Sequence, residues 1–146
     1  MEALKRLLFG RKVSFEDPVL GTFETRVRSE NPSIERTWYG GNKLEGQQSE
    51  TTFILEGNFN GPNKLDLESV KRIVSELSQI VSEIDTELSK KPQYSKISDW
   101  TKTFFLSAVM PYERGFEICF EPVNSDDIRT VNCFWVNGRI SEIEGK

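Results

Sequence analysis

The chain of 146 residues contains no histidine and only two cysteines, Cys119 and Cys133. Without histidine, the usual Ser-His and Cys-His nucleophile systems are excluded. Two thiols and carboxylates are a poor ligand set for zinc, so we predict no metal site and no cofactor. A low cysteine count is typical of a reducing compartment, and we expect a cytoplasmic protein.

Long apolar runs and nucleotide-binding motifs are also missing. No stretch approaches the roughly 20 apolar residues of a transmembrane helix, so no membrane span is predicted. Neither G-x-x-x-x-G-K-[ST] nor G-x-G-x-x-G occurs. Asp126 and Asp127 with Glu121 could bind a hard cation, but the calcium-loop pattern is absent and a solvated hairpin tip is the simpler interpretation. Acidic residues are too numerous to nominate a catalytic pair, and we predict that the protein is not an enzyme.

The charge is unevenly distributed along the chain. The net charge is −4, yet residues 1–12 carry a net +3, which leaves −7 for the remainder. An acidic body repels phosphate backbones, so nucleic-acid binding is not expected. A protein partner with a basic surface would be attracted instead.

The basic segment 1–12 is predicted to form a short N-terminal helix or arm. Leu4, Leu7 and Leu8 recur at helical spacing among Lys5 and Arg6. Such a helix could anchor the protein at a membrane surface. A helix docked on the domain is favoured, because the segment is too short for strong interfacial binding.

The motif "DPVLG" interrupts period-two apolar patterning and predicts a β-hairpin over residues 13–27. Gly21 can adopt the positive φ that such a turn requires, and Asp17 can accept bonds from nearby backbone amides. Glu16 and Glu24 then flank a turn. The alternative, a carboxylate cluster that performs chemistry, is less favoured.

The period becomes helical over residues 66–90, with Asp66 as N-cap and Pro92 as the stop. The apolar stripe predicts one long amphipathic helix that covers one face of a sheet, in preference to a partner-binding helix. The stripe consists of Leu67, Val70, Ile73, Val74, Leu77, Ile80, Val81, Ile84 and Leu88.

The other segments predict strands. Trp38 and Tyr39 close a strand before a Gly40-Gly41-Asn42 turn, and residues 51–57 and 103–110 follow, although a short helix stays open for the latter. Alternating residues predict two strands around 116–120 and 131–135, and Asn137-Gly138 predicts a type I′ hairpin before a last strand. Residues 1–146 are therefore expected to form a single α+β domain, with a mostly antiparallel sheet of six to eight strands and one helix on one face.

The strand register decides whether the two cysteines can meet. A turn centred on Asp126 and Asp127 gives Phe116, Ile118 and Phe120 one face in common with Val131, Cys133 and Trp135. Cys119 then points away from Cys133, and both thiols are free. A one-residue slip would oppose the cysteines and would place Asn132 opposite Phe120, so the first register is favoured.

Three motifs carry a family resemblance: "F-x-D-P-x-L-G-x-F" at 15–23, "W-Y-G" at 38–40 and "F-I-L-E-G-N-F-N-G-P" at 53–62, followed by the amphipathic helix. The pattern resembles a diffuse class of small bacterial proteins, some associated with polymorphic-toxin and contact-dependent inhibition systems as immunity proteins. It covers residues 1–90, and its elements are turns and core positions. The resemblance implies a cytoplasmic, non-enzymatic protein that binds and neutralises a toxin domain, and it transfers no functional residue.

Two other functions remain open: an interaction or scaffold domain with another partner, and a carboxylate-driven enzyme without histidine. For a binding protein, large amphipathic aromatics near strand ends are candidate anchors, because there they can escape the core. The nominated partner-binding residues are Trp38, Tyr39, Tyr112, Asp126 and Asp127.

Overall fold

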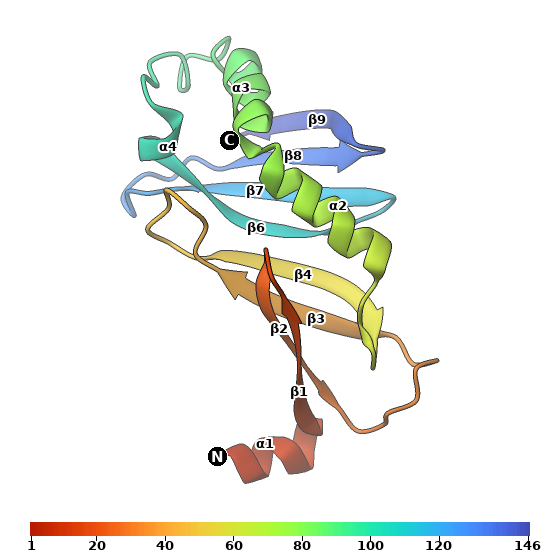
Figure 1. Ribbon diagram of the computed structural model, residues 1–146. Coiled ribbons are helices and arrows are strands. Elements are labelled where there is room, and N and C mark those ends of the chain that lie inside the picture. Colours follow the sequence, from red (N-terminus) through yellow and green to blue (C-terminus); the bar gives the residue numbers. More distant parts are fainter.

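One sheet runs through the whole of the computed structural model, which describes residues 1–146 (Figure 1). The helices are α1 (Glu2–Phe9), α2 (Lys64–Ser75), α3 (Leu77–Leu88) and α4 (Trp100–Thr103). The strands are β1 (Arg11–Asp17), β2 (Gly21–Val27), β3 (Arg36–Asn42), β4 (Thr51–Asn58), β5 (Gly61–Pro62), β6 (Phe104–Tyr112), β7 (Gly115–Pro122), β8 (Val131–Val136) and β9 (Arg139–Gly145).

The strand order is β1-β2-β3-β4-β6-β7-β8-β9, with the short β5 attached to β4. Every pair is antiparallel except β4 and β6, which the connection through α2, α3 and α4 makes parallel. The prediction of an α+β protein with a mostly antiparallel sheet is confirmed. The sheet has nine strands instead of the predicted six to eight, and the two-residue β5 is the strand outside the main order. The residues predicted to form strands at 51–57 and 103–110 lie almost entirely within β4 and β6.

Helices α2 and α3 cross one face of the sheet (Figure 1). Their buried residues join the inward-facing residues of the strands in one hydrophobic core. The prediction of a single long helix is wrong, because the chain turns at Glu76 and divides it into α2 and α3. Ser75 Oγ donates to Arg72 O at 2.8 Å, and this type of side-chain bond bends helices.

The first of these helices begins earlier than predicted. Asn63, not Asp66, is the N-cap, and its Oδ1 accepts from the amides of Leu65 and Asp66. The prediction of Asp66 is therefore wrong; Asn and Asp are both good caps, so residue type alone does not distinguish the two positions.

The hairpin predicted at "DPVLG" is confirmed. Asp17 pairs with Gly21, and Gly21 has a φ of 90°. Asp17 Oδ1 accepts from Val19 N at 2.9 Å and from Leu20 N at 2.8 Å. Asp17 is also buried, and its other carboxylate oxygen meets Lys71 Nζ of α2 at 2.6 Å. The hairpin is therefore tied to the helix layer by an ion pair.

The variant Gly21→Val should lower the free energy of unfolding by about 1 kcal/mol or more, because a β-branched residue resists positive φ. Chemical denaturation monitored by circular dichroism measures the change. Glu16→Gln, at an exposed position, and Glu24→Gln, at a half-buried position, serve as controls in the same hairpin, and both should be nearly neutral. A Gly21→Val variant as stable as the wild type would contradict this description of the turn.

The predicted turn at Gly40-Gly41-Asn42 is wrong, because all three residues belong to β3. Gly40 is buried, and a Cβ at this position would lie 2.8 Å from the ring of Phe23. The glycine therefore makes room for an aromatic ring of the neighbouring strand, which a turn pattern does not distinguish.

Side-chain hydrogen bonds reinforce the short parallel pairing of β4 and β6. Thr51 Oγ1 donates to Leu106 O at 2.7 Å, while Gln47 Oε1 accepts from Leu106 N at 2.9 Å. Gln47 Nε2 also donates to Thr51 Oγ1 at 3.0 Å. These bonds satisfy backbone groups of Leu106 where the strands part, and they join the two halves of the sheet.

Strands β7 and β8 pair as Phe116↔Trp135 and Ile118↔Cys133, so the predicted faces meet. The pairing is centred between Ser125 and Asp126 rather than between Asp126 and Asp127. This change shifts the register by two residues, which leaves every side chain on its predicted face. Cys119 pairs with Asn132, and both cysteines are free, as predicted.

The last hairpin agrees fully with its prediction, whereas the N-terminal helix agrees only in part. Asn137 and Gly138 have φ values of 54° and 82°, which confirms the predicted type I′ turn. Helix α1 forms as predicted and is tied to β2 by the ion pair between Glu2 and Arg26 at 2.7 Å. None of its residues is buried, however, so it does not join the hydrophobic core, and it lies beyond the start of β1 (Figure 1). No helix is both long enough and apolar enough to cross a membrane.

Candidate protein-binding face

The sheet has one uncovered face, on the side away from α2 and α3, which we call the open face. Core residues such as Phe53, Val109 and Ile118 point toward the helices and are buried. Their neighbours along each strand point the other way. Two of these outward-pointing residues, Ile54 and Met110, are half-buried, as expected where no helix covers the sheet.

Strand register aligns one row of open-face residues across the sheet, which we call the central row. Tyr39 pairs with Ile54 in β3 and β4. The parallel register of β4 and β6, Thr52↔Ala108 and Phe53↔Val109, continues this row from Ile54 to Met110. From there the pairs are Met110↔Glu117, Glu117↔Phe134 and Phe134↔Glu142. The central row thus combines large apolar side chains with carboxylates.

Two of the nominated aromatic residues lie on the open face. Tyr39 is 57% exposed and Tyr112 is 46% exposed. The Tyr112 ring packs beside the ring of Phe134, with centroids 4.7 Å apart. This pair restricts the mobility of Tyr112 while leaving much of its surface accessible, as suits an interface anchor.

The acidic residues of β6–β9 all lie on the open face. They are Glu117, Glu121, Glu142 and Glu144, which pair in register with other open-face positions. Arg139, the first residue of β9, is the one basic residue in these four strands. Asn132 Nδ2 donates to Glu117 Oε1 at 2.7 Å and orients that carboxylate. This half of the open face is therefore suited to cationic side chains.

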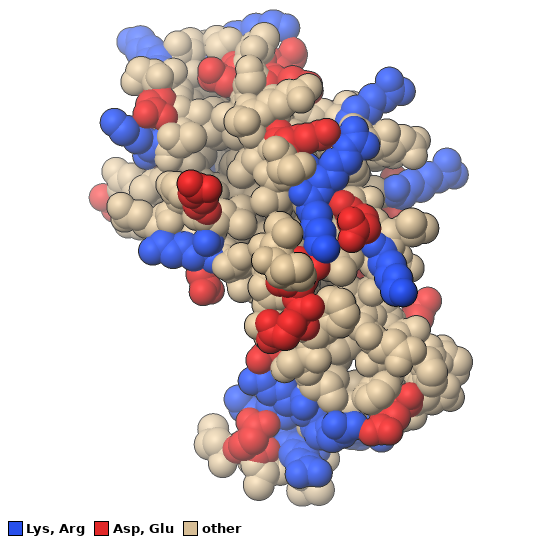
Figure 2. Space-filling view, viewed as in Figure 1, with Lys and Arg blue, Asp and Glu red and all other residues tan.

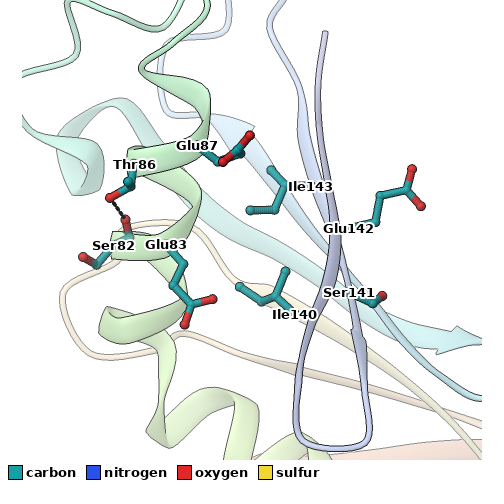
Figure 3. Close-up of a pocket in the computed structure, with 8 residues that line it drawn as sticks. All are labelled: Ser82, Glu83, Thr86, Glu87, Ile140, Ser141, Glu142 and Ile143. Atoms are coloured by element: carbon teal, nitrogen blue, oxygen red, sulfur yellow. Dashed lines mark hydrogen bonds between the residues drawn. The ribbon is translucent and has the colours of Figure 1, made fainter.

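A shallow groove continues this acidic surface around the edge strand β9. Ile140 and Ile143 point toward α3 and form its floor, while Glu83 and Glu87 of α3 rise beside them (Figure 3). Glu142 points to the opposite side, toward the open face (Figure 3). Carboxylates thus lie on both sides of β9.

Trp38 was nominated as a partner-binding residue, but this prediction is wrong, because its side chain lies in the hydrophobic core and cannot contact a partner. It is 1% exposed, its Nε1 donates to Asn58 O at 2.9 Å, and its ring meets Phe15 edge to face. Trp38 and Tyr39 are neighbours in one strand, so they point to opposite faces. The alternation of side chains alone does not indicate which of the two lies inside.

Asp126 and Asp127 lie in the loop after β7, at the opposite end of that strand from the Tyr112↔Gly115 pair. Asp126 is exposed. Asp127 receives hydrogen bonds from Arg129, including Nη2 to Oδ2 at 2.6 Å, and bonds from the Arg129 side chain and backbone lower its carboxyl pKa. The structure does not bring these two residues together with the tyrosines.

The thiols and carboxylates form no evident reactive centre. Burial raises the pKa of Cys119 and of Cys133 to about 12, so both thiols are protonated at neutral pH. No group of three or more Cys, Asp or Glu side chains is arranged to hold a metal ion.

Phe134 and Met110 of the central row were missed by sequence reasoning. Phe134 alternates with Cys133 and Trp135, which were assigned to the buried face, and this alternation was the available signal. Met110 ends a segment that was predicted as a strand without an assigned face. These residues are available to a partner only because helices cover one face of the sheet and not the other. A hydrophobic pattern does not reveal whether a second helix layer covers the other face.

Comparisons with protein-family models, curated proteins and solved structures gave no match. The resemblance to immunity proteins therefore stays a prediction. Any functional proposal depends on the open face and on the chain's own residues.

Proposed function

We propose that this protein is a non-enzymatic, cytoplasmic binding protein of the immunity type, which neutralises a toxin domain by covering a basic surface on it. The observation that carries the proposal is the central row of the open face. There Tyr39, Ile54 and Met110 lie side by side, and Phe134 lies between Glu117 and Glu142, on the sheet face that α2 and α3 leave uncovered.

The two kinds of side chain would have separate roles. The carboxylates attract a basic surface and raise the rate of encounter, an effect that salt screens over about 10 Å at 0.1 M. Tyr39 and Tyr112 would supply the large contact area that slows dissociation. The sheet holds both in fixed register, so little conformational freedom is lost on binding.

Co-expression with a toxin domain, where a neighbouring gene encodes one, tests the proposal. The wild-type protein should restore growth, and the two proteins should elute together on a sizing column. A variant with Glu117→Lys and Glu142→Lys should fold but fail to protect. A variant with Glu35→Lys and Glu45→Lys, which changes exposed carboxylates outside the open face by the same charge, should protect fully.

Full toxicity despite good expression of the wild-type protein, with no complex on the column, would remove the immunity function. An interaction or scaffold domain would then be the better description. Protection by the Glu117→Lys, Glu142→Lys variant equal to that of the wild type would instead keep the function and move the binding site away from the open face.

A further inference from the structure

Helix α1 is the most conspicuous uncovered apolar element in the molecule. Five of the twelve large hydrophobic residues that are exposed lie within residues 1–9. The side chain of Leu7, for example, is 77% exposed, and no residue of α1 is buried. A concentration of exposed apolar side chains on one short element is typical of a contact surface.

The charge around α1 identifies what kind of surface it fits. Lys5 and Arg6 of the helix and Arg28 beyond β2 take part in no ion pair. Basic side chains gather at this end of the molecule (Figure 2). An occupant should therefore offer apolar and acidic groups together.

The open face over β6–β9 offers that combination, at the far end of the same sheet. Met110, Tyr112 and Phe134 supply apolar surface, and Glu142 and Glu144 supply charge. The chain thus has a basic apolar element beside β1 and an acidic apolar face near β9. A surface with complementary ends matches itself when a second copy is turned by a two-fold rotation.

We propose that two copies of this chain pair through their open faces about a two-fold axis, so that α1 of each copy lies against the β6–β9 open face of the other. The middle of each open face, which carries Tyr39 and Tyr112, then meets its counterpart, as in aligned sheet packing. The proposal goes beyond the immunity function: the homodimer would be the resting form, and a toxin domain would have to displace the second copy.

A second copy fits better than a lipid surface. A helix of eight residues is short for interfacial binding, and the acidic remainder of the chain would be repelled by anionic lipids. The homodimer also covers α1 and the open face at the same time.

Sedimentation velocity of the purified chain without any partner tests the proposal. The wild-type protein should sediment with twice the monomer mass of 16.8 kDa. Leu7→Asp should convert it to monomers, whereas Leu65→Asp should stay dimeric. Leu65 is the matched control, because it is 79% exposed but lies on α2, away from the open face.

A charge exchange makes the test specific for the pairing. Lys5→Glu with Arg6→Glu should give monomers, as should Glu142→Lys with Glu144→Lys. Mixing the two variants should restore dimers, since each α1 then meets a face of opposite charge. A monomeric wild type, or a dimer unaffected by Leu7→Asp, would overturn the proposal. A monomeric wild type that sediments with phosphatidylserine vesicles would overturn it in favour of a membrane surface. None of these results depends on a toxin domain.

Discussion

Replacing Asp17 with alanine is expected to lower the free energy of unfolding by about 3 kcal/mol, because it leaves buried polar groups without partners. The carboxylate accepts from two backbone amides of the turn and from Lys71 Nζ. Alanine removes all three acceptor contacts at once. Lys71 keeps partial access to water and a weaker contact with Glu68, which limits the loss.

The same carboxylate should make stability depend on acid pH. Burial raises the pKa of the Asp17 carboxyl, but bonds from Lys71, Leu20 and Val19 outweigh it and hold the pKa below its ordinary value of 3.8. Because the pKa of Asp17 is lower in the folded state, the ionised carboxylate stabilises the fold fully at pH values above the unfolded-state pKa. This stabilisation is lost as the pH falls through the folded-state value. The stability difference between wild type and Asp17→Ala should therefore shrink below about pH 4.

Urea denaturation of the wild type, Asp17→Ala and Asp17→Asn at several pH values measures both effects. Asp17→Asn keeps an acceptor for the turn amides and loses only the charge, so its loss should be smaller, about 1 kcal/mol. Glu16→Gln is the control for an exposed carboxylate in the same strand and should be neutral. A loss below about 0.5 kcal/mol for Asp17→Ala would contradict the buried ion pair.

The second large effect concerns the open face. If the proposed function holds, Tyr112→Ala should weaken binding of the toxin domain about 30-fold, since truncation of an aromatic anchor typically costs about 2 kcal/mol or more. Most of the change should be in the dissociation rate, because the variant keeps the carboxylates that govern encounter. Surface plasmon resonance with the immobilised toxin domain measures both rates.

Ile128→Ala is the matched control for Tyr112→Ala. Ile128 is 92% exposed but lies in the loop after β7, so its truncation should leave both rates unchanged. The unfolding midpoint of Ile128→Ala should equal that of the wild type, and that of Tyr112→Ala should be slightly lower, because the truncation removes the ring contact with Phe134. A folded Tyr112→Ala variant that binds as tightly as the wild type would exclude Tyr112 as an anchor.

The sequence predicted those parts of the fold that depend on local patterns. Alternation of apolar residues located the strands, and the Asp17, Gly21 and Asn137-Gly138 signals located two hairpins. The break at Glu76 was not predicted, because no proline or glycine marks it. The role of Gly40 was missed because it depends on Phe23, a residue of another strand. Such contacts between distant residues leave no periodic signal.

The candidate site was predicted only in part. Tyr39 and Tyr112 were selected for their position near strand ends, and both lie on the open face. Trp38 was selected by the same rule and is buried, since the rule does not specify the face. Asp17 was recognised as a turn residue, but its ion pair with Lys71 depends on how α2 crosses the sheet. Helix α1 was expected to dock, and its exposure follows from its position beyond β1.

Hydroxyl-radical footprinting of the complex with the toxin domain tests the central claim most directly, because it reports the exposure of individual side chains. The Leu7→Asp variant is used so that self-association does not contribute. Tyr39, Met110, Tyr112 and Phe134 should become protected when the toxin domain binds, while Ile128 and Leu65 should not change. Unchanged reactivity across the open face, with protection at other residues, would contradict the claim that this face binds the partner.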